Sequence, residues 1–221
     1  MINILIVEDD KYIQEHFVKL FTADERFHLV GAVRDAFEAE QLCNKGIDLM
    51  LMDVQTLHRH SGLAAGKRIK ESCPNTKVVI MTSLVDPEVL SKAKTGCADG
   101  LCYKDHGDDE VMAVIERVLN GERSFPDETP PVELEDILSS EIKPIQLEIL
   151  RLYIRGMSFA EIGQKLGITG DAARWHIRDM VSRCGFDSKE ELMAAAIESK
   201  LIVTALKDEY IKHFPGSSDL R

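Results

Sequence analysis

The chain lacks a long hydrophobic run. Of its 221 residues, 44% are hydrophobic and 29% are charged, as in an ordinary globular protein. No apolar stretch approaches the ~20 residues that span a bilayer, and the N-terminal MINILIV has neither the basic start nor the cleavage site of a secretory signal. We therefore expect a cytoplasmic protein without a membrane segment, with one large domain or two smaller ones.

Cysteine pairs of the CxxC type are also missing. The five cysteines are scattered along the chain and odd in number. We expect reduced, buried thiols, as in a cytoplasm. Cys97 and Cys102 are interpreted as small buried hydrophobic residues and not as a redox pair.

Basic residues are outnumbered by acidic ones, 27 to 38, and the net charge of −11 taken whole argues against a partner such as nucleic acid. The charge is unevenly distributed, however. Residues 1–139 carry 15 basic and 26 acidic side chains, whereas residues 140–221 carry 12 of each. This asymmetry predicts two units with different functions. Three of the seven prolines fall within residues 121–136, which indicates a semi-rigid linker between the units.

The first unit alternates between short apolar runs and amphipathic helical patterns. The runs occupy residues 4–7, 29–33, 47–52, 78–81 and 100–103. Five β-α units of this length predict an α/β fold, a doubly wound five-stranded parallel sheet with helices on both faces.

Polar side chains follow the ends of these runs. Such sheets bind ligands at the carboxyl ends of their strands, so we expect the side chains found there to converge. They are Glu8, Asp9, Asp53, Thr82 and Lys104. Three carboxylates in one place favour a hard divalent cation with oxygen ligands, most simply Mg²⁺. A carboxylate beside a metal can accept a phosphoryl group, and the lysine and the threonine can donate to the transferred oxygens.

Residues 1–120 resemble the flavodoxin-like receiver domain of bacterial response regulators. The resemblance implies that Asp53 is the phospho-acceptor and that Thr82 and Lys104 hold the phosphoryl oxygens. It implies a Mg²⁺ site made by Glu8, Asp9, Asp53 and the main-chain carbonyl of Gln55. Asp10 is interpreted as an exposed residue that caps the first helix.

The chain departs from the receiver pattern after Asp53. The sequence DVQTLHRHSG lacks the usual Met-Pro pair, and Gly62 comes nine residues after Asp53, where the family has its glycine at eight. Leu101 stands where the family often has an aromatic switch residue, with Tyr103 on the same face of the strand. His58 and His60 are interpreted as solvated loop residues, because two histidines do not complete a metal site.

The second unit is predicted to be all helical. Ser158 and Glu161 form a capping box, and Gly167 ends that helix. In the next helix, an apolar stripe predicts a core-facing side. Its members are Ala173, Ile177, Met180, Val181 and Cys184. Trp175, the single tryptophan, points the opposite way together with two arginines. That face fits a recognition helix in the DNA major groove better than a contact with another domain.

Residues 142–202 resemble a four-helix LuxR-type helix-turn-helix domain. By that resemblance Arg174, Trp175 and Arg178 face bases, His176 and Arg183 contact the DNA backbone, and residues 189–200 pair two chains. The order of the two units is that of the NarL/FixJ response regulators. The resemblance implies a transcription factor that a sensor histidine kinase phosphorylates at Asp53 and that binds promoter DNA as a homodimer. We divide the chain into a receiver (1–120), a linker (121–139), a DNA-binding domain (140–203) and a C-terminal extension (204–221).

Two alternatives belong to other classes. A haloacid-dehalogenase-type phosphatase also uses an aspartate and Mg²⁺, but it needs an acid two residues further on, where this chain has Gln55. The chain is therefore interpreted as a regulator and not as an enzyme. The second alternative keeps DNA binding but has a receiver controlled by protein or ligand contacts instead of phosphorylation. We also expect acids near one end of the receiver to face Arg174 and Arg178, and so to mask the recognition helix until Asp53 is phosphorylated. They are Asp86, Glu88, Asp99, Asp105, Asp108 and Asp109.

Overall fold

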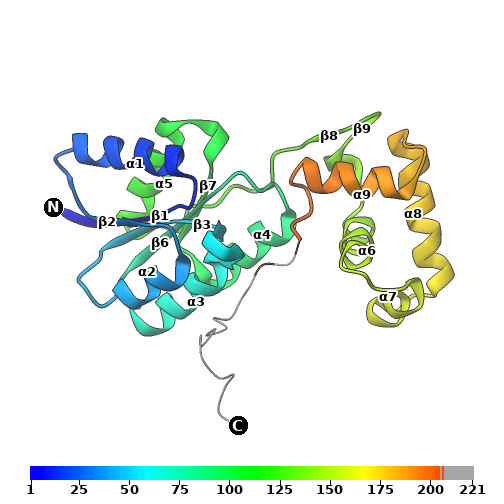
Figure 1. Cartoon of the computed structure of the whole chain (residues 1–221), viewed down its shortest axis with the longest axis horizontal. Coiled ribbons are helices and arrows are strands. Elements are labelled where there is room, and N and C mark those ends of the chain that lie inside the picture. Colours follow the sequence, from blue (N-terminus) through cyan, green and yellow to red (C-terminus); the bar gives the residue numbers. More distant parts are fainter. Residues whose placement is uncertain (205, 207–221) are drawn as a thin grey trace, which may run out of the picture.

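The structure is a computed structural model that describes residues 1–204 and 206. Two units with separate hydrophobic cores follow one another along the chain (Figure 1). The expected C-terminal extension (204–221) falls largely on residues 205 and 207–221, which lie outside the described part. Among the described helices, none combines the length and the apolar character that crossing a bilayer requires.

A five-stranded parallel sheet forms the centre of the first unit. Its strands are β1 (Ile2–Val7), β2 (Phe27–Val33), β3 (Leu49–Asp53), β6 (Lys77–Thr82) and β7 (Gly100–Tyr103). Their spatial order is β2-β1-β3-β6-β7, so the direction of winding reverses between β1 and β3. This order confirms the predicted doubly wound sheet. Ligands bind such sheets beside the reversal, at the carboxyl ends of the strands.

Five helices cover the two faces of the sheet (Figure 1). They are α1 (Lys11–Ala23), α2 (Ala36–Leu42), α3 (Gly62–Ser72), α4 (Pro87–Lys92) and α5 (Asp108–Leu119). Phe17 and Phe21 of α1 share a core with α5, while α2, α3 and α4 pack on the opposite face. Apart from the edge strand β2, which is exposed at His28 and Val30, the strands between these layers are buried on both sides, which is why they are short, mostly apolar runs.

Two small hairpins and four short helical turns lie between the larger elements in the described part of the chain. The hairpins are β4 (Gln55–Thr56) with β5 (His60–Ser61), and β8 (Glu133–Leu134) with β9 (Ile137–Leu138). The turns are Leu57–Arg59, Ala93–Cys97, Lys104–His106 and Ser139–Glu141. The second hairpin lies in the segment expected to be a linker, and it places Leu134 in the core of the second unit. That part of the segment is therefore packed against the helices that follow it.

The second unit contains four helices, as predicted. They are α6 (Pro144–Ile154), α7 (Phe159–Leu166), α8 (Gly170–Cys184) and α9 (Lys189–Glu198). Ser158 and Glu161 form the expected capping box of α7, and Gly167 ends it in a left-handed conformation. The stripe on α8 is buried at Ala173, Ile177, Met180 and Cys184, and Val181 is half-buried.

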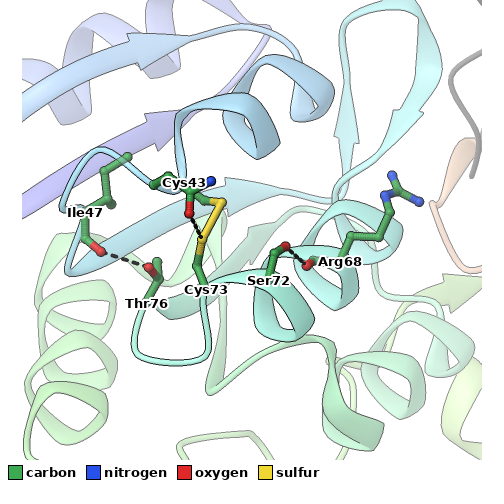
Figure 2. Close-up of a disulfide and its surroundings, with 7 residues drawn as sticks. Cys43, Ile47, Arg68, Ser72, Cys73 and Thr76 are labelled. Atoms are coloured by element: carbon green, nitrogen blue, oxygen red, sulfur yellow. Dashed lines mark hydrogen bonds between the residues drawn. A yellow bond between two sulfur atoms is a disulfide. The ribbon is translucent and has the colours of Figure 1, made fainter.

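Cys43 and Cys73 form a disulfide bond, so the expectation that all five cysteines are reduced is wrong (Figure 2). Both residues lie at the C-terminal caps of their helices, α2 and α3. These helices pack on the same face of the sheet, which brings the two Cα atoms to 6.3 Å, within the range of a disulfide. The Thr76 hydroxyl donates to the Ile47 carbonyl (2.9 Å) and joins the same two loops.

The disulfide is expected to raise the free energy of unfolding by about 3 kcal/mol, because it closes a loop of 30 residues in the unfolded chain. Chemical denaturation of the wild type and of a Cys43→Ser/Cys73→Ser variant measures this difference. Adding a reductant is the matched control, since it should bring the wild type to the level of the variant. If the reductant leaves the free energy of unfolding of the wild type unchanged, the disulfide assignment is wrong.

The other three cysteines behave as expected. Cys97, Cys102 and Cys184 are buried thiols. Burial raises the pKa of Cys97 to about 11 and that of Cys102 to about 12. Both thiols are therefore protonated at neutral pH, which makes them poor nucleophiles and confirms their interpretation as buried hydrophobic residues.

Candidate functional site

Three carboxylates meet at the edge of the sheet where the winding reverses. Glu8 and Asp9 directly follow β1, and Asp53 is the last residue of β3. One oxygen from each lies within 4.8 Å of the others. Glu8 and Asp53 are 1% and 8% exposed, and Asp9 is half-buried. The structure thus brings together the predicted acidic cluster, defined here as Glu8, Asp9 and Asp53.

Lys104 is the cation of this site. Its Nζ lies 2.6 Å from Glu8 Oε2 and 3.0 Å from Asp53 Oδ2. Burial alone would lower the pKa of Lys104, but the carboxylates of Asp53 and Glu8 outweigh it and raise the pKa above its ordinary value. The ammonium therefore stays protonated and can stabilise added negative charge at Asp53.

The electrostatics of Asp53 are dominated by its withdrawal from water. Burial raises the pKa of Asp53 from 3.8 to about 7, Lys104 opposes the rise, and the charge of Glu8 adds to it. A carboxylate in this position is costly unless a cation balances it. The acidic cluster offers three hard oxygen donors at one point, so these residues fit a divalent cation such as Mg²⁺.

Thr82 and Gln55 line the same cavity, which has a volume of about 380 Å³. Thr82 ends β6 and is fully buried, and its hydroxyl oxygen accepts a hydrogen bond from the Leu84 N–H (3.0 Å). Gln55 is exposed at the start of the loop after Asp53. All the residues that the sequence placed around the phospho-acceptor therefore border one space.

The loop after Asp53 takes up its extra residue as an outward hairpin. The β4–β5 pair carries the chain away and back, with His58 and Arg59 at φ of 60° and 63°. Gly62 then packs so closely under Asp53 that a Cβ atom would lie 1.9 Å from the Asp53 carbonyl oxygen. A glycine is required at this contact, and the hairpin brings it there despite the altered spacing.

His60 is not the solvated loop residue that the sequence predicted. It is buried, its Nδ1 lies 2.8 Å from Asp35 Oδ1, and its ring contacts Phe37 edge-on. The returning strand of the hairpin turns this side chain inward, against the start of α2. His58 is exposed, as expected.

Leu101, an aliphatic residue, occupies the strand position where related receivers often have an aromatic switch residue. Leu101 and Tyr103 are both buried in the core beneath α2, α3 and α4. Burial raises the pKa of Tyr103 to about 12, so its hydroxyl is protonated at neutral pH. These two residues share one face, as the strand alternation predicted.

The second candidate surface is the outer face of α8. The start of α8 packs closely against α7 at Gly163, where a Cβ would lie 2.8 Å from the Gly170 nitrogen. Arg174, Trp175 and Arg178 are exposed, and Trp175 is 58% exposed. The guanidinium of Arg174 lies over the Phe159 ring, 5.4 Å from its centroid, which holds it beside α7.

The other two predicted DNA contacts lie at the margins of this surface. His176 is half-buried with its ring 5.0 Å from that of Trp175. Arg183, in the last turn of α8, donates to the Glu141 carbonyl (3.2 Å). Arg183 therefore lies at the opposite end of α8 from Arg174.

Four of the expected acids do not face α8, so the expected masking of the recognition helix by these acids is wrong. Asp99 pairs with Lys70 and Asp108 with His16, both within the receiver. The Asp86 and Glu88 side chains pair instead with Arg151 and Arg155 of α6. In Figure 1, α8 lies on the side of the second unit away from the sheet. Sequence reasoning missed Arg151 because a charged residue on an apolar helix carries no signal of a partner 65 positions away.

Comparisons with known proteins agree with this geometry. The chain matches the profile of the response regulator receiver domain over residues 4–116. It is 26% identical over 215 residues to the oxygen regulatory protein NreC of Staphylococcus epidermidis, covering 90% of this chain and 99% of NreC. NreC of Staphylococcus aureus is 26% identical over 214 residues, with the same coverage.

Solved structures with the same fold include two of RcsB in complexes. RcsB of Salmonella enterica serovar Typhimurium, bound to a promoter in the presence of the phosphomimetic BeF₃⁻, superposes with a TM-score of 0.59. It is 19% identical, and the match covers 88% of this chain and 98% of that one. A structure of two RcsB dimers on two parallel DNAs gives a TM-score of 0.60 at 20% identity, covering 90% and 98% of the two chains.

Proposed function

Because the chain belongs to the response regulator receiver domain family, we propose that it is a two-component response regulator, a transcription factor gated by phosphorylation of Asp53. The observation that carries this proposal is the contact set of one carboxylate. Asp53 ends β3 within reach of two further acids and 3.0 Å from the Lys104 ammonium. Those are the groups that phosphoryl transfer to an aspartate requires.

Phosphoryl transfer from a sensor histidine kinase would occur in line. An Asp53 Oδ bonds to phosphorus while the bond from phosphorus to the histidine nitrogen breaks, and that nitrogen keeps the electron pair. Lys104 and the Thr82 hydroxyl would donate to the phosphoryl oxygens. The acidic cluster, with the main-chain carbonyl of Gln55, would hold Mg²⁺, which supplies positive charge for the transferred group.

DNA binding would be the work of α8. The exposed Arg174, Trp175 and Arg178 fit base contacts, and His176 and Arg183 fit contacts to the DNA backbone. The structure of RcsB dimers on DNA supports a dimer for this chain too. Pairing through residues 189–200 would bring two α8 helices onto one promoter. We keep the proposed division of the chain at residues 120, 139 and 203. A promoter-binding role places its action in the cytoplasm.

Labelling of the full chain by acetyl phosphate with Mg²⁺ tests the proposal. We expect Asp53→Asn to reduce the incorporated phosphoryl group to background, because the amide is no nucleophile. Asp10→Asn is the matched control: Asp10 is an exposed neighbour that caps α1, and asparagine caps a helix equally well. DNA fragments selected by the wild-type chain should bind more tightly after labelling.

Persistent labelling of Asp53→Asn, or labelling that a chelator leaves unchanged, would contradict the assignment. A chain that binds DNA but accepts no phosphoryl group would favour the alternative receiver, controlled by protein or ligand contacts. The departures at Leu101 and in the loop after Asp53 make that outcome worth measuring.

A further inference from the structure

The hairpin after Asp53 is too small to hold its shape alone. Its strands β4 and β5 have two residues each, and His58 and Arg59 between them have positive φ. Such a backbone is costly for residues other than glycine, and a two-stranded hairpin by itself is only marginally stable in water. The contacts that fix this hairpin therefore come from its surroundings.

The start of α2 supplies several of these contacts at one buried point. The Ala36 N–H donates to the Thr56 hydroxyl (3.0 Å), which in turn donates to the His60 carbonyl (3.1 Å). The His60 ring donates from Nδ1 to Asp35 Oδ1 (2.8 Å), since a carboxylate can only accept. Thr56 and His60 are both buried. We call Asp35, Thr56 and His60 the hairpin clamp.

The bond between His60 and Asp35 is shielded from water. The two side chains are 8% and 18% exposed, and the Phe37 ring packs against the imidazole with 4.3 Å between the centroids. Asp35 also caps α2 by accepting from the Phe37 N–H (2.9 Å), so the helix fixes the carboxylate. Loss of either partner leaves a buried polar group unsatisfied, which makes this bond costly to break.

The loop that carries Asp35 contacts two segments at the edge of the acidic cluster. The Arg34 carbonyl accepts from the Leu57 N–H (2.9 Å), in the loop after Asp53. The Arg34 guanidinium donates to the Asp9 carbonyl, from Nη2 at 2.7 Å and from Nε at 3.1 Å. The loop between β2 and α2 therefore holds the chain after β1 and the chain after β3 in a fixed relation.

Gln55 lies between Asp53 and the hairpin clamp. It pairs with Ser61 across the hairpin, next to the pair of Thr56 with His60. It also borders the cavity of about 380 Å³ that contains Asp53. Its main-chain carbonyl is the proposed backbone ligand of Mg²⁺. A carbonyl oxygen has no rotamer of its own, so whatever fixes the hairpin also fixes this ligand.

We propose that His60 is a positioning residue of the Mg²⁺ site, which through its bond to Asp35 holds the Gln55 carbonyl beside the acidic cluster. This rests on the proposed function of Asp53. Groups that orient a metal ligand without touching the metal change the metal affinity by about ten- to a hundredfold. Because His60 acts on one ligand of several, losing the bond should weaken cation binding about tenfold. The hairpin clamp then lets a loop with one extra residue keep its backbone ligand.

Two substitutions in the full chain break the bond from opposite sides. His60→Leu removes the donor and keeps an apolar side chain at the buried position. Asp35→Ser keeps a cap for α2, but the shorter side chain does not reach the imidazole. His60→Asn is the conservative variant, because its amide nitrogen is as many bonds from Cβ as Nδ1 is and can donate to Asp35. His58→Asn is the matched control: it changes an exposed residue of the same loop, and asparagine tolerates the left-handed backbone there.

Three measurements separate the metal site from the hairpin. Mn²⁺ binding, followed by electron paramagnetic resonance, needs no phosphoryl transfer, and the part of it that Asp53→Asn removes belongs to this site. Hydrogen exchange of the Leu57 and Ala36 amides reports whether the hairpin has loosened from α2. Labelling by acetyl phosphate over a range of Mg²⁺ concentrations gives the half-saturating concentration and the maximal rate separately.

In the His60→Leu and Asp35→Ser chains we expect Mn²⁺ to bind about tenfold more weakly and both amides to exchange faster. The Mg²⁺ concentration for half-maximal labelling should rise by the same factor, while the rate at saturating Mg²⁺ stays close to that of the wild type. His60→Asn should recover most of the lost affinity, and His58→Asn should match the wild type.

A purely structural role for His60 predicts a different result. Variants that unfold more easily but bind Mn²⁺ with wild-type affinity would overturn the proposal, as would a His60→Asn chain that binds as weakly as His60→Leu. If Asp53→Asn removes no Mn²⁺ binding from the wild type and neither chain accepts a phosphoryl group, the proposed function of Asp53 fails, and the positioning role fails with it.

Discussion

Replacing Arg174, Trp175 and Arg178 together by Ala is expected to weaken binding to a selected promoter fragment at least about a hundredfold. Each base-reading contact contributes ~1–3 kcal/mol, and the three side chains occupy the exposed face of α8. None of them belongs to the buried stripe that anchors the helix. The domain should therefore stay folded while its affinity falls, and fluorescence anisotropy at a fixed salt concentration measures the change.

Arg183→Ala is the informative comparison. If Arg183 contacts a phosphate, its loss lowers affinity for all sequences alike and reduces the slope of log affinity against log salt by about one. The triple variant should instead lose the difference between the selected fragment and a scrambled one. Retained discrimination in a triple variant with a native helical spectrum would show that another surface reads the DNA.

The Asp53→Asn chain is expected to be more stable than the wild type at pH 8 in the presence of a chelator, by about 1 to 4 kcal/mol. The pKa of Asp53 is about 7 when folded against an ordinary value of 3.8. The folded chain therefore holds an additional proton between about pH 4 and 7, and the free energy of unfolding falls as pH rises through that window. Asparagine has the same shape and no such charge.

The quantity to measure is the difference in stability between the Asp53→Asn chain and the wild type, because the other carboxylates titrate in both chains and cancel. Thermal unfolding should show the gap at pH 8 and its disappearance near pH 4, where Asp53 is protonated in folded and unfolded chains alike. Mg²⁺ should raise the melting temperature of the wild type more than that of the variant. Asp10→Asn, a change at an exposed neighbour, should be as stable as the wild type at both pH values. A variant no more stable than wild type at pH 8 would mean that Asp53 is not desolvated in solution.

The strands and the acidic cluster were predictable because both depend on local order. A strand buried on two faces is a short apolar run, and its end is the residue where that run stops, as at Asp53 and Thr82. The winding rule then brings distant strand ends to one edge without any knowledge of side-chain contacts. Leu101 and Tyr103 followed from the two-residue period of the strand in the same way.

Contacts between elements were not predictable, because they depend on how the elements pack. The disulfide joins helix ends 30 residues apart, and nothing near Cys43 or Cys73 in the sequence marks the other. His60 is buried because the returning strand of its hairpin turns that side chain inward, which the spacing of the loop does not encode. The expected masking of α8 failed for the same reason: charge patterns indicated that the units attract, but not which arginines meet Asp86.

The outward position of α8 has a consequence for dosage. If α8 reads promoter DNA as proposed, its exposure in this structure lets every copy sample DNA before any signal arrives. Its output then follows the square of its concentration wherever two copies must occupy adjacent half-sites. A higher expression level would then raise transcriptional output as a stronger signal does. The amount of the chain in the cell would set the output in the absence of phosphorylation.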